Sequence, residues 1–249
     1  MQEKIEKLIE YIKASHSIVF FGGAGVSTES GIPDFRSKDG LYNQHDVQFD
    51  RYKPEYLLSH ECLLMEPKVF YEYYRQKMDI RGIEPNITHK VLAKLEAQGK
   101  LKAVITQNID GLHQKAGSKA VYELHGTTER DYCSWCKKEY PADYIFTSKE
   151  PVPKCECGGM VRPYVTLYSE SLPEYAWSHS ISALKSADML IVAGTSLTVY
   201  PAASLLHYFA GKHLVIINRD PLNYPIDEQK DLAIWESMGQ VFAKIGENI

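Results

Sequence analysis

The sequence predicts an α/β protein with a doubly wound, mainly parallel sheet. Four short apolar runs indicate buried strands, and each is followed by turn or polar residues: 18–21, 103–105, 189–193 and 214–217. Stretches with a helical pattern of apolar residues separate these runs. Strands that alternate with helices favour a Rossmann-like sheet with helices on both faces.

The first predicted helix and two insertions complete this organisation. Ile5, Leu8, Ile9 and Ile12 follow helical spacing and predict a helix before the first strand. Two segments fit the sheet poorly: about 36–88 is rich in tyrosine and helical pattern, and about 127–165 holds four cysteines among many turn formers. We expect both to form a smaller module. One catalytic domain is expected, with its Rossmann-like part at about 1–35, 89–126 and 166–249.

Composition narrows the classes of function. The chain has 249 residues and is 44% hydrophobic, which is ample for a buried core. Its formal net charge of −4 argues against a broad surface for nucleic acid, because such surfaces depend on clustered positive charge. The charged N-terminus lacks the apolar run of a signal peptide, and no later run is long enough to span a bilayer, so we expect a cytoplasmic protein that does not bind membranes.

Four of the five cysteines form two close pairs. Cys133 and Cys136 precede Cys155 and Cys157 by 18 intervening residues, and in a reducing compartment such pairs indicate metal rather than disulfides. We expect a closed structural zinc site of four thiolates. A free-standing zinc ribbon that binds nucleic acid is the alternative, and the charge balance disfavours it. Cys62, the remaining cysteine, is expected to be a buried structural thiol.

A short glycine loop follows the first predicted strand. Gly23-Ala24-Gly25 lies where a dinucleotide fold places backbone amides against a pyrophosphate. The third glycine of that motif is absent, because position 28 is Thr28. Taken alone, the loop is also compatible with a plain tight turn.

The residues around this loop resemble a known family. GAGVSTESGIPDFR at 23–36, TQNIDGLH at 106–113, ELHG at 123–126 and GTSL at 194–197 stand in the order found in sirtuins, the NAD-dependent protein-lysine deacylases. The resemblance covers nearly the whole chain and is that of a bacterial-type minimal catalytic core. It implies a deacetylase that transfers the acyl group of an acylated-lysine protein or peptide to ADP-ribose, with release of nicotinamide.

The resemblance also assigns residues to roles. It implies that His125 is the general base and that Asn108 holds the nicotinamide ribose and a water, whereas Asp110 shapes the same pocket. Without the resemblance, Asn108 and Asp110 read as simple turn formers. The resemblance implies that Phe35 shields the reactive ribose carbon from water. The implied cofactor-binding residues are Gly23, Ala24, Gly25, Asp34, Phe35, Arg36, Gln107, Asn108, Asp110, Gly194, Thr195, Ser196 and Asn218.

The segment RPYVTLYSE at 162–170 resembles the sirtuin pattern RPxVVxFGE, which pairs with the substrate peptide. The implied substrate residues are therefore Val165, Tyr168, Ser169 and Glu170. Tyr168 replaces the phenylalanine of the pattern and Ser169 replaces the glycine. If the backbone at Ser169 requires a positive φ, the serine has a cost.

The second cysteine pair also departs from the family pattern. One residue separates Cys155 from Cys157, where sirtuins usually have two. We expect Gly158 and Gly159 to give the backbone enough freedom for four thiolates to meet around one zinc.

The tyrosine-rich segment bears on acyl choice. Sirtuins that prefer succinyl or malonyl groups carry Tyr-x-x-Arg in the matching region; here Tyr71 matches the tyrosine but Tyr74 occupies the arginine position. We therefore predict a preference for acetyl, with Tyr71 near the acyl group, unless Arg75 enters the channel from the same helix face. The alternative is that these tyrosines merely pack the small module.

Other functions remain open at this point. An ADP-ribosyltransferase or NAD glycohydrolase uses the same cofactor with another acceptor, and a non-catalytic sensor of NAD or ADP-ribose would use the same fold. A sensor is disfavoured because Asn108, Asp110 and His125 are all present. A hydride-transfer dehydrogenase is not expected, because the glycine motif is incomplete.

Overall fold

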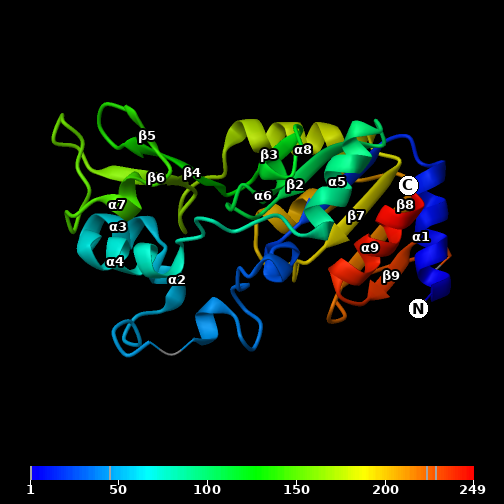
Figure 1. Cartoon of the computed structure of the whole chain (residues 1–249), viewed down its shortest axis with the longest axis horizontal. Coiled ribbons are helices and arrows are strands. Elements are labelled where there is room, and N and C mark those ends of the chain that lie inside the picture. Colours follow the sequence, from blue (N-terminus) through cyan, green and yellow to red (C-terminus); the bar gives the residue numbers. More distant parts are fainter. Residues whose placement is uncertain (1, 45, 223, 228) are drawn as a thin grey trace.

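The computed structural model describes residues 2–44, 46–222, 224–227 and 229–249. It has two parts side by side (Figure 1). A large parallel sheet with its helices forms one part, and the other contains a small antiparallel sheet and a group of short helices. No helix among the described residues has the length and apolar character needed to cross a membrane.

The large sheet has six parallel strands in the order β3-β2-β1-β7-β8-β9. The four strands expected from the apolar runs are confirmed, whereas β3 and β9, at the two edges, were not predicted. The strands are β1 (Ile18–Gly22), β2 (Leu101–Thr106), β3 (Val121–Glu123), β7 (Met189–Ala193), β8 (His213–Asn218) and β9 (Leu232–Trp235).

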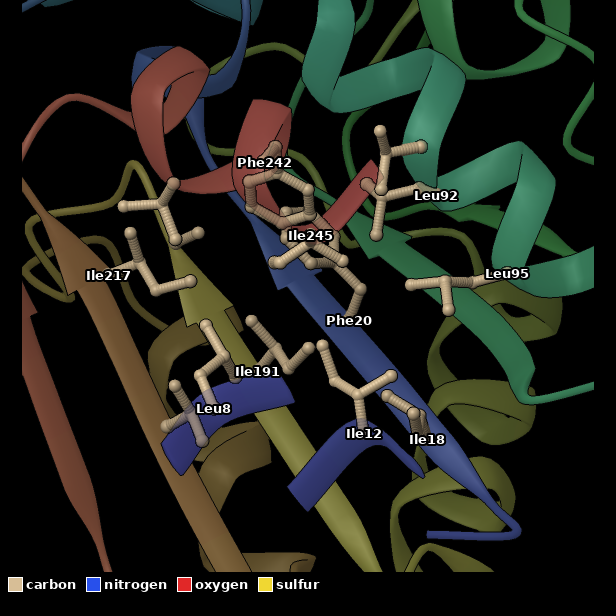
Figure 2. Close-up of a cluster of buried hydrophobic side chains, with 14 of the residues drawn as sticks. Leu8, Ile12, Ile18, Phe20, Leu92, Leu95, Ile191, Ile217, Phe242 and Ile245 are labelled. Atoms are coloured by element: carbon tan, nitrogen blue, oxygen red, sulfur yellow. The ribbon is translucent and has the colours of Figure 1, made fainter. Parts of the chain in front are cut away.

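Helices cover both faces of this sheet. One face packs against α1 (Gln2–Ala14), α5 (Ile87–Ala97) and α9 (Met238–Asn248). Leu8 and Ile12 of α1 point toward Ile191 and other strand residues in Figure 2, as the helical spacing of the sequence predicts. The other face packs against α8 (Glu174–Ser186) and the 3₁₀ helix η4 (Ala202–Tyr208). Each large apolar side chain buried in these layers stabilises the fold by about 1.5–3 kcal/mol.

The second part joins both insertions. Its antiparallel sheet has the order β5-β4-β6, with β4 (Gly126–Cys133), β5 (Glu139–Pro141) and β6 (Val161–Val165). One apolar cluster contains side chains from both insertions, including Tyr71 and Tyr74 of the first and Ile145 of the second. The helices of this part are α2 (Pro54–Leu57), α3 (His60–Met65), α4 (Pro67–Lys77) and α7 (Tyr144–Thr147).

The strand register brings four loops to one edge of the large sheet. Gly22 at the end of β1 pairs with Thr106 of β2 and with Ala193 of β7, which in turn pairs with Ile217 of β8. The strand order reverses at β1, and open α/β sheets bind ligands where it reverses. The segments that follow these four strands include η1 (Ala24–Val26), η2 (Thr28–Ser30), η3 (Leu41–Asn43) and α6 (Leu112–Lys115).

Candidate active site at the carboxyl ends of the strands

The glycine loop after β1 packs directly against the loop after β7. The amide of Gly25 donates to the Gly194 carbonyl over 2.9 Å. A Cβ added to Gly25 would lie 2.8 Å from the Cα of Gly194, and one added to Gly23 would lie 2.8 Å from the Gly194 carbonyl oxygen. Real Cβ atoms do not approach other atoms so closely, so both positions require glycine for the contact between the two loops. Ala24, between them, begins η1.

His125, which lies between β3 and β4, is held as a neutral base. Its Nδ1 lies 2.9 Å from the backbone carbonyl oxygen of Gln107. A carbonyl oxygen only accepts, so Nδ1 carries the proton and Nε2 keeps its lone pair. Burial lowers the pKa of His125, and the charge of Arg36 lowers it further, although the bond to Gln107 opposes both effects. The imidazole is therefore ready to accept a proton at neutral pH.

Gln107 connects three of the strand ends. Its amide donates to the Gly22 carbonyl over 2.9 Å, and its side-chain Nε2 donates to the Thr195 hydroxyl over 3.0 Å. Together with its bond to His125, these contacts tie the segment after β2 to β1 and to the loop after β7. The predicted residues Gln107, His125 and Thr195 therefore lie in one network.

Asn108 and Asp110 meet at a buried serine. The Ser27 hydroxyl donates to the Asp110 carboxylate over 2.6 Å and accepts from the Asn108 side-chain amide over 3.0 Å. Nδ2 of Asn108 is used in this way, and no hydrogen bond among the described residues uses its Oδ1, which is able to accept. Burial raises the pKa of Asp110, and its hydrogen bonds to Ser27 and to the Leu112 amide oppose this rise.

Sequence reasoning missed Ser27 and its neighbour His89. Nε2 of His89 lies 3.5 Å from the Ser27 hydroxyl, and its Nδ1 accepts from the Asn86 amide. Since Nδ1 accepts, the proton of the neutral ring is on Nε2 and points to Ser27. Burial lowers the pKa of His89 to about 4, so the ring stays neutral at pH 7. Ser27 lies within the motif after the glycine loop, but its sequence position does not reveal these partners.

The segment of residues 34–44, called the 34–44 loop below, is closed on itself. Oδ1 of Asp34 accepts from the amides of Arg36 and Ser37 over 3.1 and 2.8 Å. The ring of Phe35 packs edge-on against Tyr42, with 5.4 Å between the ring centroids. Arg36 reaches out of the loop and donates to the Tyr168 hydroxyl over 3.3 Å.

The predicted substrate residues lie in residues 165–170, called the 165–170 segment. A groove of about 660 Å³ is lined by Val165, Ser169 and Glu170 together with Gly126, the neighbour of His125. Ser169 has a φ of 72°, the left-handed region that favours glycine. Serine in place of the family glycine therefore has the cost of a side chain held at a positive φ.

Glu170 is engaged by the protein itself. It accepts from Arg162 over 2.6 and 2.8 Å, from the Leu167 amide over 2.9 Å, and it lies 2.8 Å from Nδ1 of His60. Burial alone would raise the pKa of Glu170, but these partners lower it to about 2. The carboxylate therefore holds the 165–170 segment in shape, a role that the sequence did not indicate.

The structure does not bring Tyr71 to this groove. Its side chain is fully buried in the apolar cluster of the small module, and its hydroxyl donates to the Val161 carbonyl over 2.7 Å. No surface of Tyr71 is exposed in this structure, and its expected contact with the acyl group stays a prediction. Its position agrees with the alternative stated above, that these tyrosines pack the small module. The face of α4 that carries Tyr71 is turned toward β6.

Ser196 and Asn218 also lie beyond strand ends. Ser196 is exposed, and its hydroxyl lies 2.7 Å from that of Thr198. Asn218 ends β8, where its side chain donates to the Asp220 carbonyl over 2.7 Å. Neither side chain contacts His125 or Asn108 in the hydrogen bonds of the described residues.

The four paired cysteines converge on one point. Their Sγ atoms all lie within 4.8 Å of one another, with 3.5 Å between Cys133 and Cys157 and 3.6 Å between Cys136 and Cys155. Tetrahedral thiolates around Zn²⁺ at roughly 2.3 Å are separated by roughly 3.8 Å, so the cluster fits a closed structural zinc site. The Cys-x-Cys spacing is therefore compatible with the metal.

Comparisons with known proteins agree with this geometry. The Sir2 family model matches residues 23–201. An NAD-dependent protein deacetylase from Clostridium acetobutylicum is 50% identical over 244 residues, covering 98% of each chain. One from Clostridium perfringens is 51% identical over 248 residues, covering 98% of this chain and 99% of the other.

Solved structures agree as well. A Sir2 structure with a p53 peptide and NAD⁺ has a TM-score of 0.84 at 36% identity, covering 98% of this chain and 97% of that chain. Sir2 bound to an acetylated peptide has a TM-score of 0.84 at 33% identity, with the same coverage. The chain therefore belongs to the Sir2 family, the sirtuins.

Proposed function

We propose that this protein is an NAD-dependent protein-lysine deacetylase that transfers the acetyl group to ADP-ribose. The observation that carries the proposal is the state of His125: Nδ1 is bound by the Gln107 carbonyl, which leaves Nε2 free to take a proton. NAD as co-substrate would supply an electrophilic ribose carbon from which nicotinamide departs. Two relatives of similar length are named NAD-dependent protein deacetylase.

The residues at the strand ends suit that co-substrate. Gly23 and Gly25 carry no side chain, so a pyrophosphate could approach the backbone of this loop closely, although the amides of these two glycines already donate to the carbonyls of Ala193 and Gly194. Asn108 would accept from a ribose hydroxyl or a water through its free Oδ1 without placing a full charge beside the nicotinamide. Thr195, Ser196 and Asn218 would bind the remaining diphosphate and ribose groups.

Water exclusion and peptide binding complete the proposal. Phe35, held against Tyr42, would cover the reactive carbon, and Asp34 and Arg36 would flank the nicotinamide side of the site. An acylated lysine would enter along the groove beside Val165 and Ser169, where peptide backbone pairing gives affinity with little demand on sequence. We infer a cytoplasmic enzyme that acts on proteins and has no nucleic-acid partner.

The products test the function directly. Purified protein is incubated with NAD and an acetyl-lysine peptide, with the His125→Ala variant as the control. We expect nicotinamide, deacetylated peptide and O-acetyl-ADP-ribose in equal amounts from the wild type. Nicotinamide with free ADP-ribose and intact peptide would mean a glycohydrolase, and ADP-ribose attached to the peptide would mean an ADP-ribosyltransferase; either result overturns the proposal.

The acyl group is the finer part of the proposal. Arg75 is held by the small module, because its guanidinium donates to the carbonyls of Ile145 and Glu150 over 2.8 Å each. Tyr74 is fully buried. Arg75 is therefore not free to meet a succinyl carboxylate, and a buried carboxylate without a partner costs several kcal/mol. We expect kcat/KM for an acetyl peptide to exceed that for the succinyl form of the same peptide, and equal or reversed values would contradict this preference.

A further inference from the structure

The hydroxyl of Tyr168 lies between two side chains of the 34–44 loop. It is 2.7 Å from the hydroxyl of Tyr42, and Nη2 of Arg36 donates to it over 3.3 Å. The Arg36 guanidinium also lies over the Tyr42 ring, 5.5 Å from its centroid. One hydroxyl therefore links the 165–170 segment to the 34–44 loop.

The backbone of Tyr168 is fixed independently of this hydroxyl. Its amide donates to the Leu58 carbonyl over 3.0 Å, and its carbonyl accepts from the His60 amide over 3.1 Å. The neighbours Val165 and Ser169 line the groove proposed for the peptide. Any shift of the 165–170 segment on peptide binding thus reaches the Tyr168 side chain directly.

The other end of the link reaches Phe35. Tyr42, which contacts Tyr168, packs edge-on against the Phe35 ring with centroids 5.4 Å apart. Burial raises the pKa of Tyr42, and the nearby Tyr168 raises it further, so the Tyr42 hydroxyl keeps its proton. The position of Phe35 therefore depends on the contact between the hydroxyls of Tyr42 and Tyr168.

We propose that the Tyr168 hydroxyl couples binding of the acylated peptide to binding of NAD. This inference rests on the proposed function, because it takes the 34–44 loop as part of the NAD site and the 165–170 segment as the peptide site. A peptide that pairs with the 165–170 segment shifts the Tyr168 side chain, and the Tyr168 hydroxyl passes this shift to Arg36, Tyr42 and the 34–44 loop. Coupling between two sites is reciprocal, so NAD raises the affinity for the peptide by the same factor.

The test compares wild type with Tyr168→Phe, which removes one oxygen and restores the phenylalanine of the sirtuin pattern. The Kd of carba-NAD, an analogue that does not release nicotinamide, is measured by calorimetry with and without a saturating acetyl-lysine peptide. We divide the Kd of carba-NAD without peptide by its Kd with peptide and expect this ratio to be well above one in the wild type. In Tyr168→Phe the ratio should fall about two- to tenfold, the range expected for one hydrogen bond.

Tyr56→Phe is the matched control. Tyr56 belongs to the small module too, and its hydroxyl donates to Glu66 over 2.9 Å, so this variant also loses one tyrosine hydrogen bond but none to the 34–44 loop. We expect its ratio of Kd values to equal that of the wild type. Equal ratios in wild type and Tyr168→Phe would overturn the inference, and so would a wild-type ratio of one.

A second measurement follows the Phe35 end of the link. If Tyr168→Phe loosens the loop, water reaches the ribose carbon and converts NAD to nicotinamide, ADP-ribose and a proton. Nicotinamide released per lysine freed should then rise above one in Tyr168→Phe while it stays near one in wild type and Tyr56→Phe. Absence of any deacetylation by wild type would refute the proposed function, whereas an active wild type with unchanged ratios in Tyr168→Phe refutes the coupling alone.

Discussion

Replacement of Glu170 by glutamine should destabilise the whole fold. The carboxylate and Arg162 form an ion pair at 2.6 Å in which the arginine side chain is only 9% exposed. Glutamine would fill the same space but leave the Arg162 cation buried without a counter-charge. Loss of one partner of a buried pair typically costs about 3–5 kcal/mol.

The lowered pKa of Glu170 gives a similar free energy of stabilisation. Its hydrogen bonds and ion pair overcome the effect of burial and lower the pKa from 4.5 to about 2. A shift of this size corresponds to about 3 kcal/mol. Because the folded-state pKa is the lower one, this stabilisation is complete above about pH 4.5 and is lost as the pH falls toward about 2.

Urea unfolding of wild type and Glu170→Gln, both saturated with zinc, measures the effect. At pH 7 we expect the free energy of unfolding to be about 3–5 kcal/mol lower in the variant. The control is Glu247→Gln, whose partner Lys244 is 58% exposed, and here we expect a change below about 0.5 kcal/mol. A loss below about 1 kcal/mol in Glu170→Gln would refute the reasoning from the buried pair.

Three further predictions concern other parts of the molecule. His125→Ala should lower deacetylation about 10²- to 10⁴-fold in kcat while calorimetry shows nearly unchanged NAD affinity; turnover above about half of wild type would remove its role as base. Metal analysis should find about one zinc per chain, and a chelator should unfold the cysteine-bearing insertion and abolish activity; active protein without metal contradicts this. Burial lowers the pKa of His113 to about 3, and its ring nitrogens have no hydrogen-bond partner among the described residues. Below pH 6.5 the unfolded chain therefore gains a proton that the folded chain does not, which lowers the free energy of unfolding by about 1.4 kcal/mol per pH unit. Urea unfolding of His113→Leu should therefore show a smaller loss between pH 6 and 4 than wild type, and equal slopes would exclude this cause.

The sheet was predictable where its strands are buried on both faces. The runs at 18–21 and 189–193 are continuously apolar because helices cover them above and below, and this pattern is visible in the sequence. Strands β3 and β9 pair on one side only and are three and four residues long. β3, Val-Tyr-Glu, carries too little apolar pattern to stand out from a loop, whereas β9, Leu-Ala-Ile-Trp, is a continuous apolar run that the same criterion could have found.

The active site was predictable from strand ends but not from side-chain contacts. Motifs that follow parallel strands must meet at one edge, which is why His125 and Gln107 are neighbours. The bond between Asn108 and Ser27 joins residues 81 positions apart, and its donor and acceptor atoms follow from packing. Tyr71 shows the same limit: helical spacing indicates that one face of α4 is apolar, but not that β6 covers it.

The reversal of strand order at β1 divides the large sheet into two halves that separate stretches of the chain build. The stretch up to β3 builds one side of the large sheet, and the stretch from β7 onward builds the other. The small antiparallel sheet lies between these stretches, so insertions or deletions there leave the register of every parallel strand unchanged. Evolution, or a designer of chimeras, is thus able to remodel the surface offered to protein substrates while the proposed nucleotide site is inherited intact.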